Sequence, residues 1–237
     1  MKSVFKIIIV FVFGMAGGIF ANQILLPYFV QQHLFSEYQI VQTPLSAGRQ
    51  NKVTITENIA LQESVEKVKK TVVGVLTKTK SGKILTGSGL VVTSDGLMIT
   101  LSELIPRGEE FVFFIDGKTP GYQVLKRDPK NNLALVKLEE GNFQTCGFAD
   151  FNKLKLGERV FLVGVIFEKT KPIKVVNEGI VKFFNQDYIR TNIFEKYTLA
   201  GSPLFNIKGE LLGLNLIDSE GKVLSIPIVK IRHFLGL

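Results

Sequence analysis

The fold class is decided by one stretch of the sequence, Thr86-Gly-Ser-Gly-Leu-Val-Val-Thr-Ser-Asp-Gly-Leu-Met-Ile-Thr100. Its centre, Ser94-Asp95-Gly96, contains the Asp-Gly pair that is typical of a β-hairpin turn. The residues from Ile84 to Thr93 and from Leu97 to Thr100 are short and largely apolar, which favours a strand on each side of the turn. The stretch therefore predicts an antiparallel hairpin.

The same alternation of short apolar runs and turn signals continues along the chain. Further strands are expected at residues 71–76, 110–116, 122–126, 133–138, 159–165, 174–184, 188–193, 204–206, 210–217 and 223–226. One helix is expected over residues 57–70, and a second over residues 228–234, because Pro227 suits the start of a helix. About twelve strands with almost no helix between them predict an all-β protein, an antiparallel sandwich or barrel, or two barrels.

The composition limits the possible functions. The chain has 237 residues, a net charge of +8, one cysteine and two histidines. The lone Cys146 excludes an internal disulfide framework and any cysteine-based zinc cluster, and neither a metal nor a cofactor is expected. The histidines, His33 and His233, lie near the two ends and are interpreted as surface or packing residues. The basic residues are interspersed with acidic ones, so no nucleic-acid partner is expected.

The N-terminal segment predicts a helix that spans a membrane. Residues 7–26 carry no charge, and at about 1.5 Å per residue a helix of this length spans about 30 Å of hydrocarbon. Lys2 and Lys6 precede the segment, and the next charge is Glu37. By the positive-inside rule the N-terminus stays in the cytoplasm and the remainder of the chain is exported.

This topology predicts a single-pass membrane anchor over residues 1–30, a linker over residues 31–56 and an extracytoplasmic domain over residues 57–237. A cleaved signal peptide that ends near Ala21 is the alternative. Gly14 and Gly18 form a GxxxG pair, which could bring two anchors together as a homo-oligomer.

Three segments of the exported part resemble the trypsin-like serine proteases of the HtrA/DegP type. They are Thr86 to Ile105, Lys126-Arg-Asp-Pro-Lys-Asn-Asn-Leu-Ala-Leu-Val-Lys137, and Thr191 to Gly213, which contains Gly201-Ser-Pro-Leu-Phe-Asn206. They occur in the order that the family shows, and the resemblance covers about residues 60–237. It implies a double six-stranded antiparallel β-barrel with a cleft between the barrels. It also implies that the PDZ domain common in this family is missing.

The resemblance assigns the functional positions one at a time. The catalytic histidine of the family falls on Glu103, its aspartate on Asn132 and its nucleophilic serine on Ala200. The loop that forms the oxyanion hole falls on Thr198, Leu199 and Ala200. Ala200 has no hydroxyl to activate, and Asn132 cannot stabilise an imidazolium. We therefore expect a degenerate member, a pseudoprotease that binds peptides or proteins without cleaving them.

Peptides bind to proteases of this fold as an added β-strand, and the corresponding edge here is Leu216, Ile217 and Asp218. Two other functions stay open. A hydrolase, such as a serine-type endopeptidase, could use Ser202 as nucleophile or Glu103 as general base at a non-standard site. Alternatively, the basic surface could bind anionic polymers of the cell envelope.

Overall fold

The computed structural model describes residues 6, 11–15, 17 and 20, and residues 56–139 and 141–237. The chain divides into two units, residues 1–52 and residues 53–237. The described residues of the first unit are helical and exposed. Among the residues that the structure describes, no helix combines the length and the apolar character needed to cross a bilayer. Most of the predicted anchor and linker lie outside the described residues, so both stay predictions.

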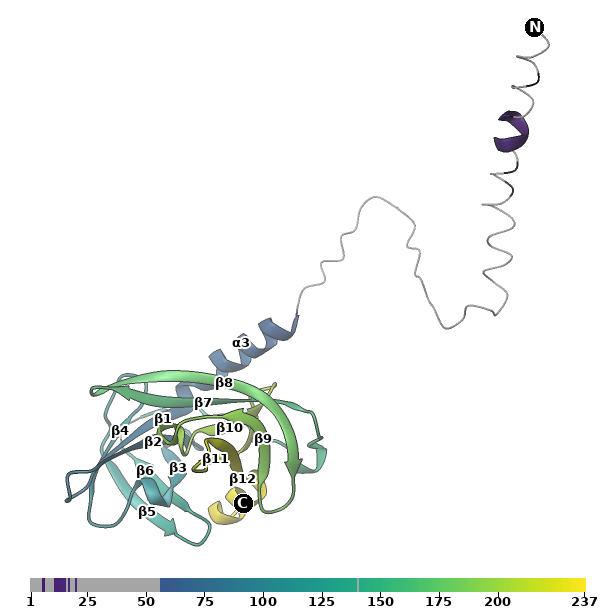
Figure 1. Cartoon of the computed structure of the whole chain (residues 1–237). Helices are drawn as coiled ribbons and strands as arrows, with labels where there is room; N and C mark the ends of the chain where they lie inside the picture. Colours follow the sequence, from purple (N-terminus) through teal and green to yellow (C-terminus); the bar gives the residue numbers. More distant parts are fainter. Residues whose placement is uncertain (1–5, 7–10, 16, 18–19, 21–55, 140) are drawn as a thin grey trace. The chain divides into compact units, whose positions relative to one another are not determined.

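The first half of the second unit is a six-stranded antiparallel sheet with the order β4-β1-β2-β3-β6-β5 (Figure 1). Its strands are β1 (Val72–Lys78), β2 (Ile84–Val91), β3 (Leu97–Leu101), β4 (Glu110–Phe114), β5 (Tyr122–Asp128) and β6 (Leu133–Leu138). The predicted Asp-Gly hairpin joins β2 to β3. Gly96 has a φ of 98°, a conformation that glycine adopts without steric cost, and the N–H of Leu97 donates to Oγ1 of Thr93 at 3.0 Å.

The second half is a closed barrel with the order β10-β11-β12-β9-β8-β7. Its strands are β7 (Arg159–Glu168), β8 (Lys171–Phe184), β9 (Ile189–Phe194), β10 (Pro203–Asn206), β11 (Leu211–Ile217) and β12 (Lys222–Pro227). The β7–β8 hairpin is three residues longer on each arm than the sequence predicts, because the pairing continues as far as Glu168 opposite Lys171. Pro172 pairs with Phe167 within this extension.

Two α-helices flank the sheets, α3 (Thr56–Val68) and α4 (Ile228–Leu235). Helix α4 ends where Gly236 adopts a φ of 81° as the C-cap, with its N–H bonded back to the last turn. Four short 3₁₀ helices complete the described elements: η2 (Lys69–Thr71), η3 (Ser102–Leu104), η4 (Phe151–Lys153) and η5 (Tyr197–Leu199). The predicted strands and both predicted helices are therefore confirmed, and so is the all-β class.

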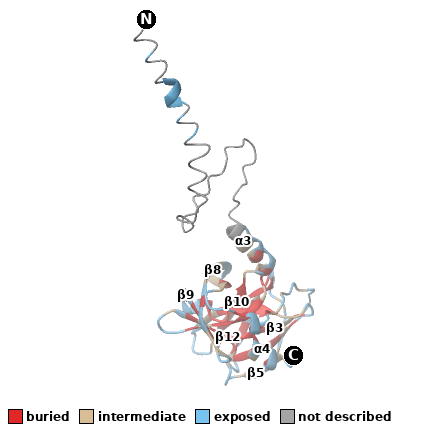
Figure 2. Cartoon of the chain, turned by 90° about the vertical axis from the view of Figure 1, so that its right-hand side faces the viewer, coloured by how far each residue is buried: buried red, intermediate tan, exposed pale blue. Residues whose placement is uncertain are grey.

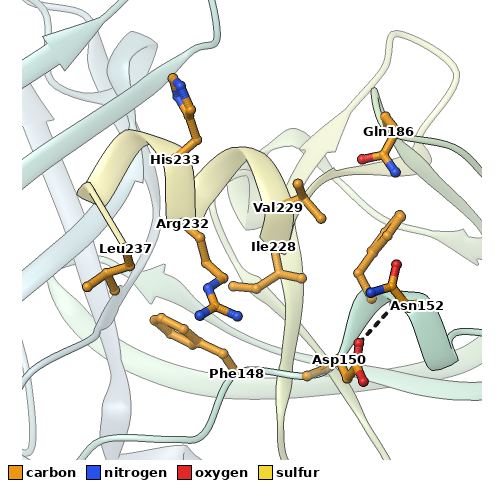
Figure 3. Close-up of a pocket in the computed structure, with 11 residues that line it drawn as sticks. Phe148, Asp150, Asn152, Gln186, Ile228, Val229, Arg232, His233 and Leu237 are labelled. Carbon is orange, nitrogen blue, oxygen red and sulfur yellow. Dashed lines mark hydrogen bonds between the residues drawn. The ribbon is translucent and has the colours of Figure 1, made fainter.

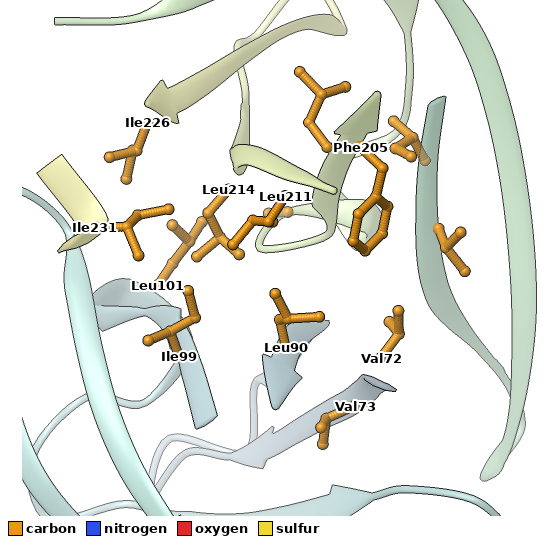
Figure 4. Close-up of a cluster of buried hydrophobic side chains, with 14 of the residues drawn as sticks. Val72, Val73, Leu90, Ile99, Leu101, Phe205, Leu211, Leu214, Ile226 and Ile231 are labelled. Atoms are coloured by element: carbon orange, nitrogen blue, oxygen red, sulfur yellow. The ribbon is translucent and has the colours of Figure 1, made fainter. Parts of the chain in front are cut away.

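The two sheets share one hydrophobic core, which appears as a continuous buried zone in Figure 2. In Figure 4, side chains of β2 and β3 lie opposite those of β10 and β11, and Ile231 of α4 packs at one end. The sheets approach so closely at Gly87 that a Cβ there would lie 2.4 Å from Cδ1 of Leu104 and 2.7 Å from the carbonyl oxygen of Ala200. This contact places η3 and η5, one from each sheet, next to each other.

Candidate functional site

The first sheet contributes Glu103 and Asn132 to the junction. Glu103 lies in η3, directly after β3, and its side chain is exposed. Asn132 precedes β6 with a φ of 53°, a left-handed conformation that asparagine tolerates better than most residues. Its Oδ1 accepts a hydrogen bond from the N–H of Glu103 at 3.0 Å, and its carbonyl oxygen accepts one from Ser102 at 3.1 Å. The side chain of Asn132 therefore positions the η3 turn.

The second barrel contributes η5 and Ala200, which is completely buried. The carbonyl oxygen of Ala200 accepts a hydrogen bond from the N–H of Ser88 in β2 at 2.9 Å. Gly201 follows with a φ of 77°, and a Cβ at this position would lie 2.3 Å from the carbonyl oxygen of Ser88 and 3.0 Å from Cδ1 of Leu104. The three positions that the sequence matches to a triad thus converge at the junction of the two sheets.

The backbone amides of the η5 turn are bonded within the turn. The N–H of Leu199 donates to the carbonyl oxygen of Lys196, and the N–H of Ala200 donates to that of Tyr197, both at 2.9 Å. An oxyanion hole requires donors that are aimed at the place where negative charge develops. The amides of Leu199 and Ala200 are instead committed to carbonyl oxygens of the turn.

Tyr197 is a member of this site that the sequence analysis did not single out. Burial is the main cause that raises the pKa of its phenol, and the negative charge of Glu103 and a hydrogen bond to that carboxylate raise the pKa further. The contact joins η5 of the barrel to η3 of the first sheet. The available signal in the sequence was an aromatic residue three positions before Ala200.

The alternative nucleophile proposed from the sequence lies two residues after Ala200. Ser202 is completely buried, and its Oγ accepts a hydrogen bond from Nδ2 of Asn215 at 3.0 Å. Oδ1 of the same asparagine accepts one from Oγ of Ser225 at 2.5 Å, so Ser202 is part of a buried network in the barrel. Burial raises the pKa of the Cys146 thiol to about 12, which leaves little thiolate at neutral pH. His233 lies on α4, and His33 lies outside the described residues.

The predicted peptide-binding edge divides into two parts. Strand β11 pairs with β10 only as far as Leu214 opposite Pro203, and Asn215 continues the pairing through 2.8 Å hydrogen bonds with Gly201 and Ser202. Because backbone groups of successive residues alternate in direction, the N–H and C=O of Ile217 face the same side as those of Asn215, beyond the end of β10.

Leu216 and Asp218 have other roles. Leu216 pairs with Leu224 of β12, and its backbone N–H and C=O face β12 instead of the open side beyond β10. Asp218 lies in the turn after β11, where its Oδ1 accepts hydrogen bonds from the N–H groups of Glu220 and Lys222, each at 2.9 Å. Of the three predicted residues, Ile217 is therefore the one whose backbone groups point past β10, while its side chain is buried in the core.

Comparison with known proteins defines the class first. The family model "Trypsin-like peptidase domain" matches residues 87–214, and the chain belongs to this family. Its relatives are proteases of the HtrA and DegP type, as the sequence predicts. "Serine protease HTRA1" of Xenopus tropicalis is 30% identical over 135 residues, which cover 51% of this chain and 29% of that protein. "Probable periplasmic serine endoprotease DegP-like" of Pseudomonas putida is 33% identical over 96 residues, which cover 37% of this chain and 20% of that protein.

A solved structure confirms the fold. The structure "HtrA-type protease AlgW with tripeptide" superimposes with a TM-score of 0.67 at 20% sequence identity, and the match covers 74% of this chain and 62% of that one. The matched regions span less than a third of the length of the curated relatives named above. The comparisons therefore establish the family and the fold of this domain.

Proposed function

We propose that the protein is a membrane-anchored, extracytoplasmic pseudoprotease of the HtrA type that holds extended peptides without cleaving them. One observation carries this proposal. Ala200 occupies the position that the sequence matches to the nucleophile, and its methyl group is completely buried at the junction of the two sheets. Acyl transfer by the serine mechanism requires a hydroxyl at that position, within reach of a base.

The surroundings of Ala200 support the same conclusion. The carboxamide of Asn132, matched to the triad aspartate, accepts a hydrogen bond from the backbone N–H of Glu103 and carries no negative charge that could stabilise an imidazolium. Glu103 lies beside the Tyr197 phenol instead of beside a nucleophile. The amides of Leu199 and Ala200 are bonded within their own turn. These features support the proposed lack of catalysis.

Peptide binding is proposed from the edge at Ile217. Its N–H and C=O face past the end of β10, which is the geometry that a peptide needs to add to the sheet as a further strand. The structural neighbour AlgW is described with a tripeptide, which agrees with peptide binding by a protein of this fold.

The membrane anchor is proposed from the uncharged residues 7–26 and the preceding Lys2 and Lys6. The name of the DegP-like relatives includes "periplasmic", which agrees with export of the domain. A reporter fused after Leu237 should be active only outside the cytoplasm. Cytoplasmic activity of the fusion would contradict the proposed topology, and a mature chain that begins near Asn22 would favour the signal-peptide alternative.

The absence of catalysis is tested with the full-length chain in detergent. We expect neither cleavage of casein nor labelling by a serine-directed fluorophosphonate. Ala200→Ser alone should also be inactive, because loss of the histidine alone lowers turnover about 10⁶-fold in enzymes of this mechanism. The triple variant Glu103→His, Asn132→Asp and Ala200→Ser restores the residues of a triad and is the positive control. We expect weak activity at most, because the η5 amides that would form an oxyanion hole are bonded within their own turn. Cleavage by the wild type that is lost in Ser202→Ala or Glu103→Gln would refute the proposal.

Strand addition is tested by N-methylation of a bound peptide, because N-methylation removes one backbone donor at a time. Only alternate residues of an added strand donate to the protein, so binding should fall at every second methylated position and persist at the positions between. Substitution of Asp218 is a poor test because it would remove two hydrogen bonds of the turn. Equal losses at consecutive positions would show that the peptide is not held as a strand.

A further inference from the structure

A second candidate binding site lies away from the junction of the sheets. A pocket of about 510 Å³ opens between α4 and the segment that contains η4, and Gln186 of the β8–β9 turn closes one side of it (Figure 3). Its walls are largely apolar, with Phe148, Phe151, Ile228 and Val229 among them. It includes neither the positions matched to the triad nor Ile217.

The charges of the pocket are unequal. Asp150 is the acidic side chain in its lining, and its Oδ1 accepts a hydrogen bond from the N–H of Asn152 at 3.1 Å. Its Oδ2 lies 3.3 Å from Nζ of Lys153, so this negative charge is already balanced. Arg232 extends from α4 toward the Phe148 ring (Figure 3). Among the described residues, its guanidinium has neither an ion pair nor a side-chain hydrogen bond. The pocket therefore contains one cationic side chain without an ion-pair partner in the described part of the chain, beside an apolar wall.

This combination selects a class of ligand. Pockets of about 300–1,000 Å³ hold small molecules whose body is buried by apolar side chains and whose orientation is fixed by a few polar groups. A guanidinium matches the two oxygens of a carboxylate or a phosphate. Val229 is 38% exposed in the free protein and would be covered by an apolar ligand body. We propose that this pocket binds a small amphiphilic anion, with its charged group on Arg232 and its hydrocarbon body against Phe148 and Val229.

The test uses 4-phenylbutyrate and the uncharged 4-phenylbutanol as probes. Binding is measured calorimetrically with the full chain in lipid nanodiscs, with empty nanodiscs as the blank. We expect saturable binding of the acid. The alcohol should bind at least about tenfold more weakly than the acid, because it lacks the charged group that accepts a hydrogen bond from Arg232. Arg232→Gln should weaken binding of the acid by a similar factor, since its exposed side chain can be replaced without disturbing the core.

Lys230→Gln is the matched control. It removes the same charge from the same helix, but Lys230 is outside the pocket lining and pairs with Asp187 at 2.8 Å. The affinity of the Lys230→Gln variant for the acid should stay within about twofold of that of the wild type. Phenylbutyl phosphate distinguishes the two sources of charge: tighter binding than the acid identifies a phosphate ligand, and weaker binding a carboxylate.

Three outcomes would overturn the proposal: no saturable binding of either anion, equal affinities for the acid and the alcohol, or equal losses in Arg232→Gln and Lys230→Gln. The proposal is independent of peptide binding, because the pocket contains no residue of the edge at Ile217.

Discussion

The two six-stranded sheets are closed by different means. In the second, backbone hydrogen bonds run around the full circle from β7 through β10, β11, β12 and β9 to β8. In the first, β4 and β5 are the two ends of the strand order. Side chains close the gap between them: the Tyr122 ring lies 4.9 Å from that of Phe113 and 5.9 Å from that of Phe111. Arg127 adds a hydrogen bond from Nε to the carbonyl oxygen of Ile105 at 2.9 Å.

We call these five residues the aromatic seam. In the closed barrel each strand pairs with a neighbour on both sides, and the end of β11 at Ile217 extends beyond its partner β10, whereas the seam depends on a few side chains that can separate locally. Each half also carries one side of the candidate site, with η3 and Asn132 on the first sheet and η5 on the barrel. The two sides of the site therefore rest on supports of unequal strength, and amide exchange should be faster in β4 and β5 than in the barrel.

The largest expected effect tests whether the two halves unfold together. Phe205 in β10 is completely buried, and its ring lies 5.4 Å from that of Phe161 within the core that both sheets share (Figure 4). Phe205→Ala should lower the free energy of unfolding by about 3–5 kcal/mol. Because the core is shared, urea unfolding followed by circular dichroism should show one transition. Two separated transitions would show that the first sheet unfolds independently of the barrel.

Breaking the seam should have a smaller and more local effect. Tyr122 is half-buried, so Tyr122→Ala should cost about 2 kcal/mol, less than a fully buried aromatic residue. Amide exchange should accelerate in β4 and β5 and change little in the barrel. The matched control is Tyr188→Ala, which removes a half-buried ring 5.7 Å from Phe183 on the closed barrel. If Tyr188→Ala accelerates amide exchange in β8 and β9 as much as Tyr122→Ala does in β4 and β5, closure by backbone hydrogen bonds gives the barrel no added protection against exchange.

Arg127 tests the polar part of the seam. Arg127→Met keeps the length of the side chain but removes the hydrogen bond to Ile105 and the charge 5.9 Å from the Phe111 ring centroid. We expect a loss of about 1 kcal/mol in thermal or urea unfolding. Lys130→Met, at an exposed position of the following turn, should be nearly neutral. A neutral Arg127→Met would mean that the rings alone close the sheet.

Much of the fold could be predicted because its local signals are strong. The Asp95-Gly96 pair marks the β2–β3 turn, and Pro227 marks the start of α4. The ends of the β7–β8 hairpin could not be read in the same way. Its pairing continues through Phe167 opposite Pro172, and an isolated proline in a sequence argues against a strand unless the partner strand is known.

The candidate site was predictable in position but not in contacts. The spacing of the three matched segments was enough to place Glu103, Asn132 and Ala200, and the structure brings these turns together. The periodicity of a strand indicates which side chains are buried, but it does not identify partners that are distant in the sequence. The contact of Tyr197 with Glu103 and the hydrogen bonds within η5 depend on such distant packing.

The smallest expected effect measures the contact that joins the two halves at the site. Burial first, and then Glu103, raise the pKa of Tyr197 above its ordinary value of about 10. Because the folded pKa is the higher one, the stabilising contribution is present below about pH 10 and is lost as the pH rises through the folded pKa. Glu103→Gln should lower the pKa of Tyr197 without returning it to the ordinary value, because burial remains.

The measurement is a titration of tyrosinate absorbance, with Tyr197→Phe to identify this residue among the five tyrosines. Glu110→Gln, an exposed carboxylate on β4, is the control and should leave the titration unchanged. The seam can be weakened by Tyr122→Ala or by Arg127→Met. Arg127→Met is the better variant here, because Tyr122→Ala removes a phenol that itself contributes to the titration. If Arg127→Met lowers the pKa of Tyr197 as Glu103→Gln does, the weaker closure of the first sheet extends to η3. An unchanged pKa would show that Asn132 holds η3 in place independently of the seam.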